Sequence, residues 1–302
     1  MFVYVIYSRP NTNQSENDTE IKVYCDSLEF ITNYNDLFSL DCSYNELTEI
    51  SHLPSNLHKF ICTNNKLTSL PELPNSLQIL SCSENRLTKL PKLPINLQTI
   101  LCYENTLTLL PELPVSINHI SISYNNLTEL PILPNNIDYL DCRYNNLTSL
   151  PELPNSLTEI LCCGNNLSFL PELPNSLIEL DCSSNKLIHL PKLPDLLQIL
   201  KCSHNNLNLL PKLPTSLTIL YCDNNHLTLL PKLPLSIKSL ICQNNYLTLL
   251  PKLPLSIKSL MCQNNYLTIL PDLHDSIENF YYYDNNFVQN HNNNYLLSII
   301  YN

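Results

Sequence analysis

The chain has 302 residues, a formal net charge of −11 and 44% hydrophobic residues. Such an acidic chain is a poor partner for nucleic acid or an anionic membrane surface, because both carry negative charge. No segment approaches the roughly 18 consecutive apolar residues that a membrane span requires. A single glycine, Gly164, stands against 23 prolines. Asparagine, which tolerates left-handed backbone best after glycine, is therefore expected to supply the tight turns.

Residues 1–36 are predicted to form an N-terminal cap. The apolar segment 2–7 is predicted to be a strand, because it lacks the basic flank and the length of a secretory signal. A polar loop over 11–20 follows it, and residues 21–36 look like a degenerate first repeat. At the other end, residues 291–302 contain the apolar segment YLLSII and are predicted to form a C-terminal cap.

Between the caps, residues 37–290 consist of about thirteen copies of one 20-residue unit, LxxLxCxxNxLTxLPxLPxS. Asparagine recurs in one register at positions 45, 65, 85, 105, 125, 145, 165, 185, 205, 225, 245, 265 and 285. The unit at 231–250 is repeated at 251–270 with only two differences, Ile241/Met261 and Leu249/Ile269. Self-similarity at this period predicts a solenoid in which each repeat packs on its neighbours.

Each repeat is predicted to contain one short strand and one extended return leg. Leu80 and Cys82 alternate with Ser81 and Ser83, so the apolar pair is expected to face inward and the serines to face solvent. Two prolines three residues apart remove backbone donors and disfavour helix, which predicts a return leg of polyproline type. The expected product is a right-handed solenoid with a parallel sheet on its concave face and few or no helices.

This pattern resembles the leucine-rich repeat family, whose signature LxxLxLxxNxL is met by LQILSCSENRL (77–87) and LIELDCSSNKL (177–187). The short period and the LPELP segment look most like the LPX subclass of bacterial effectors. The composition, rich in Asn, Ile, Tyr and Lys, is also similar to that of repeat proteins of giant DNA viruses. The resemblance implies a leucine-rich repeat fold of the α/β superfamily, here mostly β, with a protein-binding role.

Cysteine occupies one inward column in eleven repeats, Cys82 and Cys142 among them, and Ile122 takes the same place once. Because isoleucine carries no thiol, we interpret the column as small buried hydrophobic filling. Such thiols are typical of a reducing compartment, so we expect a cytoplasmic or host-cell intracellular protein. No CxxC pair is present and histidine never shares the column, so neither a metal nor another cofactor is predicted.

The asparagine column, which includes Asn65, Asn85 and Asn145, is expected to be structural. A buried amide at the end of a strand both donates and accepts hydrogen bonds, so it can pair with backbone groups that a turn leaves open. Stacked over thirteen repeats, these side chains are expected to form a ladder.

Function is expected in the outward positions of the concave face, because the inward columns maintain the shape. Two neighbourhoods stand out. The acidic patch with aromatic edges comprises Asp138, Tyr139, Asp141, Tyr144, Glu159, Glu179 and Asp181. The apolar stripe comprises Ile199, Ile219, Tyr221, Ile241, Met261 and Tyr281. Exposed apolar surface commonly marks an interaction site, although strand propensity alone produces the same residue types.

Catalysis is not predicted. Cys163, the one cysteine of the array expected to face outward, lies two repeats from His204. At about 5 Å per repeat this separation is too long for a nucleophile and its base. We therefore expect a non-enzymatic protein-interaction scaffold that binds a partner with basic and apolar features on its concave face. The alternative is a structural component that self-associates through the solenoid.

Overall fold

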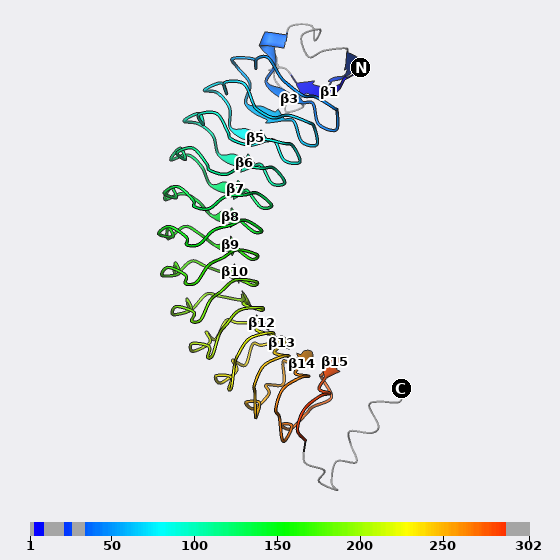
Figure 1. Cartoon of the computed structure of the whole chain (residues 1–302), viewed down its shortest axis with the longest axis vertical. Coiled ribbons are helices and arrows are strands. Elements are labelled where there is room, and N and C mark those ends of the chain that lie inside the picture. The colour runs from blue at the N-terminus through cyan, green and yellow to red at the C-terminus, as the bar shows by residue number, and fades with distance from the viewer. Residues whose placement is uncertain (1–2, 9–20, 26–33, 288–302) are drawn as a thin grey trace, which may run out of the picture.

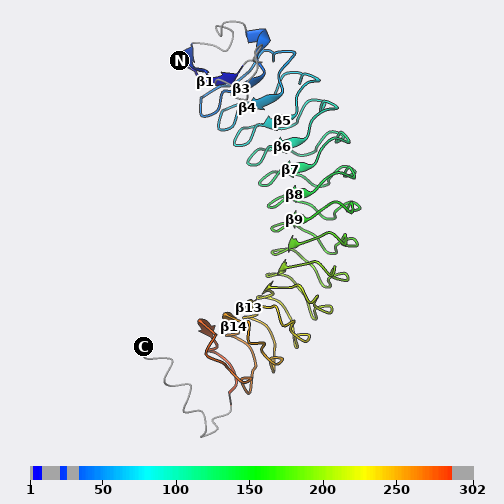
Figure 2. The ribbon, with the colours of Figure 1, turned by 180° about the vertical axis from the view of Figure 1, so that it is seen from behind.

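A computed structural model describes the backbone of residues 3–8, 21–25 and 34–287, and the side chains of residues 34–287. These residues form a single 15-stranded sheet in the order β15-β14-β13-β12-β11-β10-β9-β8-β7-β6-β5-β4-β3-β1-β2. Figures 1 and 2 show the repeats stacked as rungs of one long, curved solenoid, with β1 at one end and β15 at the other.

Thirteen of the strands are parallel and recur every 20 residues. Each pairs in register with the next rung, so that Leu80 lies beside Ile100. Their bounds are β3 Ser39–Asp41, β4 Lys59–Ile61, β5 Ile79–Ser81, β6 Thr99–Leu101, β7 His119–Ser121, β8 Tyr139–Asp141, β9 Glu159–Leu161, β10 Glu179–Asp181, β11 Ile199–Lys201, β12 Ile219–Tyr221, β13 Ser239–Ile241, β14 Ser259–Met261 and β15 Asn279–Tyr281.

The return legs carry no helix in the described residues, where one 3-10 turn at Tyr34–Asp36 is the only helical element. The predicted parallel sheet with extended legs is confirmed. Leu77, Leu80, Cys82 and Leu87 are fully buried in one rung, and their equivalents continue the same core along the array. Burial stabilises the folded rung by about 1.5–3 kcal/mol per large side chain, but the conformational entropy lost by ordering its twenty residues offsets this gain. A rung is therefore stable only when it stacks on its neighbours.

A turn follows the second proline of each leg, where the Leu77 N–H donates to the Pro74 carbonyl at 3.0 Å. The consensus serine of this turn joins neighbouring rungs. Ser76 Oγ lies 2.8 Å from the Leu57 carbonyl and 3.0 Å from the Ser55 carbonyl. The sequence pattern contained this serine, but it does not by itself reveal the serine's bonds to the preceding rung.

The asparagine ladder is present. Asn145 Nδ2 donates to the Ile122 carbonyl of the previous rung at 3.0 Å, and to the Cys142 and Arg143 carbonyls of its own rung at 3.2 Å. Its Oδ1 accepts a bond of 3.0 Å from the Leu127 N–H. Asn65 and Asn85 make the equivalent bonds. One buried amide per rung therefore saturates backbone groups of two rungs at once.

The expectation that asparagine supplies the left-handed turns is wrong at most rungs. The residue before each ladder asparagine has positive φ, between 50° and 56° in twelve rungs, and only Asn64, Asn224, Asn244 and Asn264 are asparagines. Tyrosine, glutamate, serine, histidine and aspartate take the other places. The N–H of this residue bonds to the next rung, as Tyr144 does to the Cys163 carbonyl at 2.8 Å. Such bonds offset a conformational cost of about 1–2 kcal/mol.

The outward side of the strand is also less exposed than its alternation predicts. Ser81 is 9% exposed and Ser83 is fully buried, whereas both were expected to face solvent. Neighbouring rungs lie only about 4.8 Å apart, so side chains of adjacent strands shield one another. Small outward side chains such as serine are shielded most by the larger side chains of the adjacent strands.

The N-terminal segment is built differently from the repeats. Strand β1 (Val3–Ser8), close to the predicted strand at 2–7, pairs antiparallel with β3, and β2 (Ile21–Cys25) pairs antiparallel with β1 at the edge of the sheet. Residues 21–25 therefore do not continue the parallel ladder as a degenerate first repeat would. The domain boundaries at 36 and 290 stay predictions, and the expected cap at 291–302 lies outside the described residues.

The cysteine column is buried. All twelve cysteines within residues 34–287, Cys82 and Cys142 among them, are free thiols and buried. Burial raises the pKa of the Cys62 and Cys182 thiols well above the usual range, which keeps them protonated. The column therefore acts as packing.

Replacing Asn145 with alanine is expected to lower the free energy of unfolding by about 1–3 kcal/mol, because the Leu127 N–H and the carbonyls of two rungs lose their partner. Asn146→Ala is the matched control, since this neighbour is exposed. Urea unfolding followed by circular dichroism measures both. Equal stability of the two variants would contradict the structural role of the ladder.

Candidate functional site on the strand face

The strand face comprises the outward side chains of each strand, of the residue before it and of the three residues after it. The acidic patch lies near its middle, on β8, β9 and β10. Register places Tyr139, Glu159 and Glu179 side by side on consecutive strands. Asp141 and Asp181 lie in the next column, two rungs apart with Leu161 between them, and Asp138 is exposed just before β8. The structure thus brings the predicted patch together.

Two of these carboxylates already have cationic partners. Arg143 grips Asp141 with two bonds of 2.9 Å, from Nε to Oδ1 and from Nη2 to Oδ2, and Asp141 is only 3% exposed. Lys201 Nζ lies 2.8 Å from Glu179 Oε1. Neither cation belonged to the predicted patch. A prediction from the acidic residues in the strand columns does not include Arg143, because this residue follows the strand and its side chain extends back over the strand.

Glu159 is a carboxylate of the patch whose pKa is raised in the folded chain, although the charges of Lys201 and Arg143 lower it in part. It is half-buried between Tyr139 and Glu179 and forms no ion pair within residues 34–287. Burial first, and the negative charge of Glu179 second, raise the pKa of Glu159. Burial also raises the pKa of Tyr139, with Asp141 as the next cause. The ionised Glu159 therefore costs free energy in the folded chain.

Two aromatic stacks border the patch on β7 and β8. The rings of His119 and Tyr139 stack at 4.2 Å between centroids with 5° between planes. Those of Tyr124 and Tyr144 stack at 4.4 Å with 19° between planes. Tyr144 is 46% exposed, so it offers a preformed amphipathic contact.

Gly164 explains why Tyr144 lies where it does. A Cβ at Gly164 would stand 2.6 Å from Tyr144 Cδ1, closer than any real contact. Positive φ alone does not require glycine here, since twelve other rungs tolerate it with a side chain. The single glycine of the chain thus leaves room for an aromatic ring at the edge of the patch.

The apolar stripe is contiguous but less exposed than predicted. Tyr221, Ile241, Met261 and Tyr281 follow one another on adjacent strands, and Ile199 pairs with Ile219. All are half-buried except Tyr281, at 46% exposure. More exposed apolar residues in this half lie in a column that the sequence analysis did not single out, at Leu209, Leu229, Leu249 and Ile269. The segment LTLLP does not reveal which of its leucines turns outward.

Cys163 was expected to face outward and is instead 8% exposed. Burial raises the pKa of its thiol to about 11, so the nucleophilic thiolate is scarce at neutral pH. No group of three or more His, Cys, Asp or Glu side chains within the described residues is arranged to hold a metal ion. In the same part of the chain, no helix is both long and apolar enough to cross a membrane.

No protein-family model and no curated protein sequence matches the chain. Solved structures do. YopM from Yersinia enterocolitica superposes with a TM-score of 0.83 and 35% identity over 84% of this chain and 57% of that protein. YopM from Yersinia pestis, described as a leucine-rich effector protein, is 33% identical with a TM-score of 0.61, over 81% of this chain and 82% of its own.

The chain belongs to the leucine-rich repeat family. Within that family, the effector subclass with short repeats fits it. This leucine-rich repeat protein spans 57% of the length of the Yersinia enterocolitica chain. InlJ from Listeria monocytogenes is 25% identical with a TM-score of 0.61, over 83% of this chain and 63% of that one. Its functional domain includes a cysteine ladder.

Glu159→Gln is expected to stabilise the free chain at neutral pH, because the variant removes a charge that folding desolvates. A raised folded pKa means that the native state holds its proton longer than the unfolded state does. The wild type therefore loses stability relative to the variant as pH rises from about 4.3 through the raised pKa of Glu159, and the two are alike below that window. Urea unfolding at several pH values measures the difference, and a constant difference would contradict the assignment.

Proposed function

We propose that this leucine-rich repeat protein is a non-enzymatic protein-interaction scaffold that binds its partner on the strand face over β7 to β10. The partner presents a lysine or arginine to Glu159, with apolar or aromatic side chains around it. The observation that carries the proposal is a half-buried carboxylate that keeps a raised pKa and forms no ion pair among residues 34–287, although Lys201 and Arg143 lower this pKa in part.

The electrostatics of the patch favour Glu159 over its neighbours as the contact point. Asp141 and Glu179 already pair with Arg143 and Lys201, so a further cation gains little there. At Glu159 an incoming cation would relieve both the desolvation and the repulsion from Glu179. Such a pair sets orientation and specificity, because the wrong charge at this place is strongly disfavoured.

The bordering rings supply contact area that charge alone does not. Tyr139 and Tyr144 are held by stacking on His119 and Tyr124, so binding costs little side-chain entropy. Tyrosine is enriched at protein interfaces for this combination of rigid area and a polar tip.

Proteins of the same fold bind protein ligands. The plant receptor RGFR1 forms a complex with RGF2, and Toll forms one with Spätzle. For this chain, the buried free thiols and the likeness to effector proteins support a reducing, intracellular setting.

The test is a quantitative pull-down from the native cell with the full chain and three variants. Glu159→Lys is expected to weaken capture of a specific, saturable partner about tenfold or more, because a repulsive pair replaces an attractive one. Glu129→Lys is the matched control, since this exposed glutamate lies in a different column.

The third variant, Tyr221→Glu/Ile241→Glu, probes the apolar stripe. Retained capture by this variant together with loss in Glu159→Lys supports the proposed site. Loss in the stripe variant alone would place the partner on β12 and β13 and overturn the assignment to the patch. Undiminished capture by all three variants would exclude the strand face as the contact surface.

A further inference from the structure

The proline face, formed by the outward side chains of the extended legs, carries one residue per rung between the first proline and the next leucine. In chain order this column reads Glu72, Lys92, Glu112, Ile132, Glu152, Glu172, Lys192, Lys212, Lys232, Lys252 and Asp272. All eleven side chains are exposed. None forms an ion pair within residues 34–287.

From Lys92 to Asp272 the charges of this column reverse about the midpoint between Glu172 and Lys192, and the counterpart of Glu72 falls outside the described residues. Residues at equal distance from the midpoint carry opposite charge in four of the five pairs: Glu172 with Lys192, Glu152 with Lys212, Glu112 with Lys252, and Lys92 with Asp272. The fifth pair is Ile132 with Lys232. A two-fold axis through the midpoint, lying in the plane of the face, would set each residue against its opposite in a second copy.

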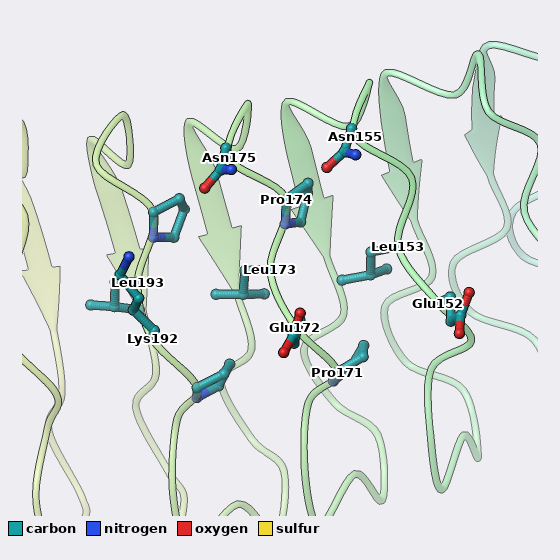
Figure 3. Close-up of a pocket in the computed structure, with 12 residues that line it drawn as sticks. Glu152, Leu153, Asn155, Pro171, Glu172, Leu173, Pro174, Asn175, Lys192 and Leu193 are labelled. Carbon is teal, nitrogen blue, oxygen red and sulfur yellow. The ribbon is translucent and has the colours of Figure 1, made fainter.

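Apolar surface lies beside this midpoint, centred on the rung of Glu172. A hollow of about 860 Å³ is lined by Glu152, Leu153, Asn155, Pro171, Glu172, Leu173, Pro174, Asn175, Pro191, Lys192, Leu193 and Pro194. Figure 3 shows Leu153, Leu173 and Leu193 in a row across it, with the strands behind them. Glu152, Glu172 and Lys192 stand beside this row, so the apolar floor and the charges belong to one surface.

Exposed aliphatic residues extend this surface outward. Val115 and Leu255 are 79% and 78% exposed, and they lie at equal distances from the same midpoint in a neighbouring column. The symmetry operation that pairs the charges relates Val115 of one copy to Leu255 of the other, whereas it relates Leu235, at 85% exposure, to the polar Asn135. Ile132, at 88% exposure, meets the aliphatic stem of Lys232 in the same arrangement.

We propose that two copies of this chain associate antiparallel through their proline faces, about a two-fold axis between the rungs of Glu172 and Lys192. Four lysines follow one another in this column at about 4.8 Å per rung, and their mutual repulsion is relieved by the glutamates of a second copy. Each exposed ion pair contributes little to the affinity of the dimer. Most of the affinity therefore comes from burying the apolar surface of the hollow and of the aliphatic pairs. The charges set the register and the antiparallel direction.

The association leaves both strand faces pointing away from the interface. A dimer would then present two partner sites, and a partner with repeated epitopes would bind it with avidity. The dimer does not depend on the proposed strand-face site, because no residue of the acidic patch belongs to the proline face.

Charge exchange on the full chain tests the proposal. One variant is Glu152→Lys/Glu172→Lys and the other is Lys192→Glu/Lys212→Glu, all at exposed positions where substitution leaves the core intact. Each variant alone sets like charges against each other at the centre of the dimer, whereas a mixture of the two restores opposite charges. Sedimentation velocity at low ionic strength measures the mass of the sedimenting species, which is compared with the 34.7 kDa of one chain.

We expect the wild type to dimerise, each variant alone to weaken association about tenfold or more, and the equimolar mixture to recover it. Glu129→Lys/Lys186→Glu is the control with the same number of reversals in other columns, and it should dimerise like the wild type. Added salt should weaken the wild-type dimer. A wild type that stays monomeric up to about 100 μM, or a mixture no more associated than its components, would overturn the proposal.

Discussion

Each rung depends on a buried asparagine amide that bonds to the backbone of two rungs. The three-residue strands and the turn that follows them leave carbonyl and N–H groups without backbone partners, and each ladder asparagine from Asn65 to Asn285 bonds to four such groups, as Asn145 does. The twenty-residue period cannot drift, because one inserted residue would move the amide out of reach of the preceding rung. The regular spacing of the asparagines from 45 to 285 follows from this geometry.

The ladder also determines which positions are free to vary. Packing fills the inward columns mainly with leucine, isoleucine and cysteine, with Phe60 as an exception, and the residue before the asparagine has a left-handed backbone in residues of several types. The outward columns of the strand face and of the proline face are not under these structural constraints. The acidic patch with its aromatic stacks and the antisymmetric charge column both lie there. Two faces of one solenoid can therefore serve a partner and a second copy independently.

Repetition made the fold predictable from the amino-acid sequence. The period, the alternation of Leu80 with Cys82 and the paired prolines predict the parallel sheet, the buried thiols and the extended legs. For the candidate site, the sequence predicted which residues lie near one another but not which side chains pair. Alternation placed Tyr139, Glu159 and Glu179 in one column, but pairing of Arg143 with Asp141 depends on a side chain reaching back across the strand. A contact of this kind occurs in one repeat only, so the periodic pattern of the sequence does not reveal it.

Other differences have equally local causes. Ser83 is buried because neighbouring rungs are close, and Gly164 is required by the ring of Tyr144, which lies in the preceding rung. The antiparallel pairing of β1 with β3 arises where the repeat pattern has not yet begun. Each of these features is decided by what stands beside a residue in space, and a single repeat of the sequence does not contain that information.

The central claim is that one register of inward side chains continues along the whole described array. Pulse alkylation of each cysteine in the full chain, followed by mass spectrometry under non-reducing conditions, tests it most directly. The account predicts slow labelling of every column cysteine from Cys42 to Cys262 in the native protein, and labelling of all 13 cysteines once the chain is denatured. Rapid native labelling within the column, or thiols that remain unreactive after denaturation because they are paired, would contradict it.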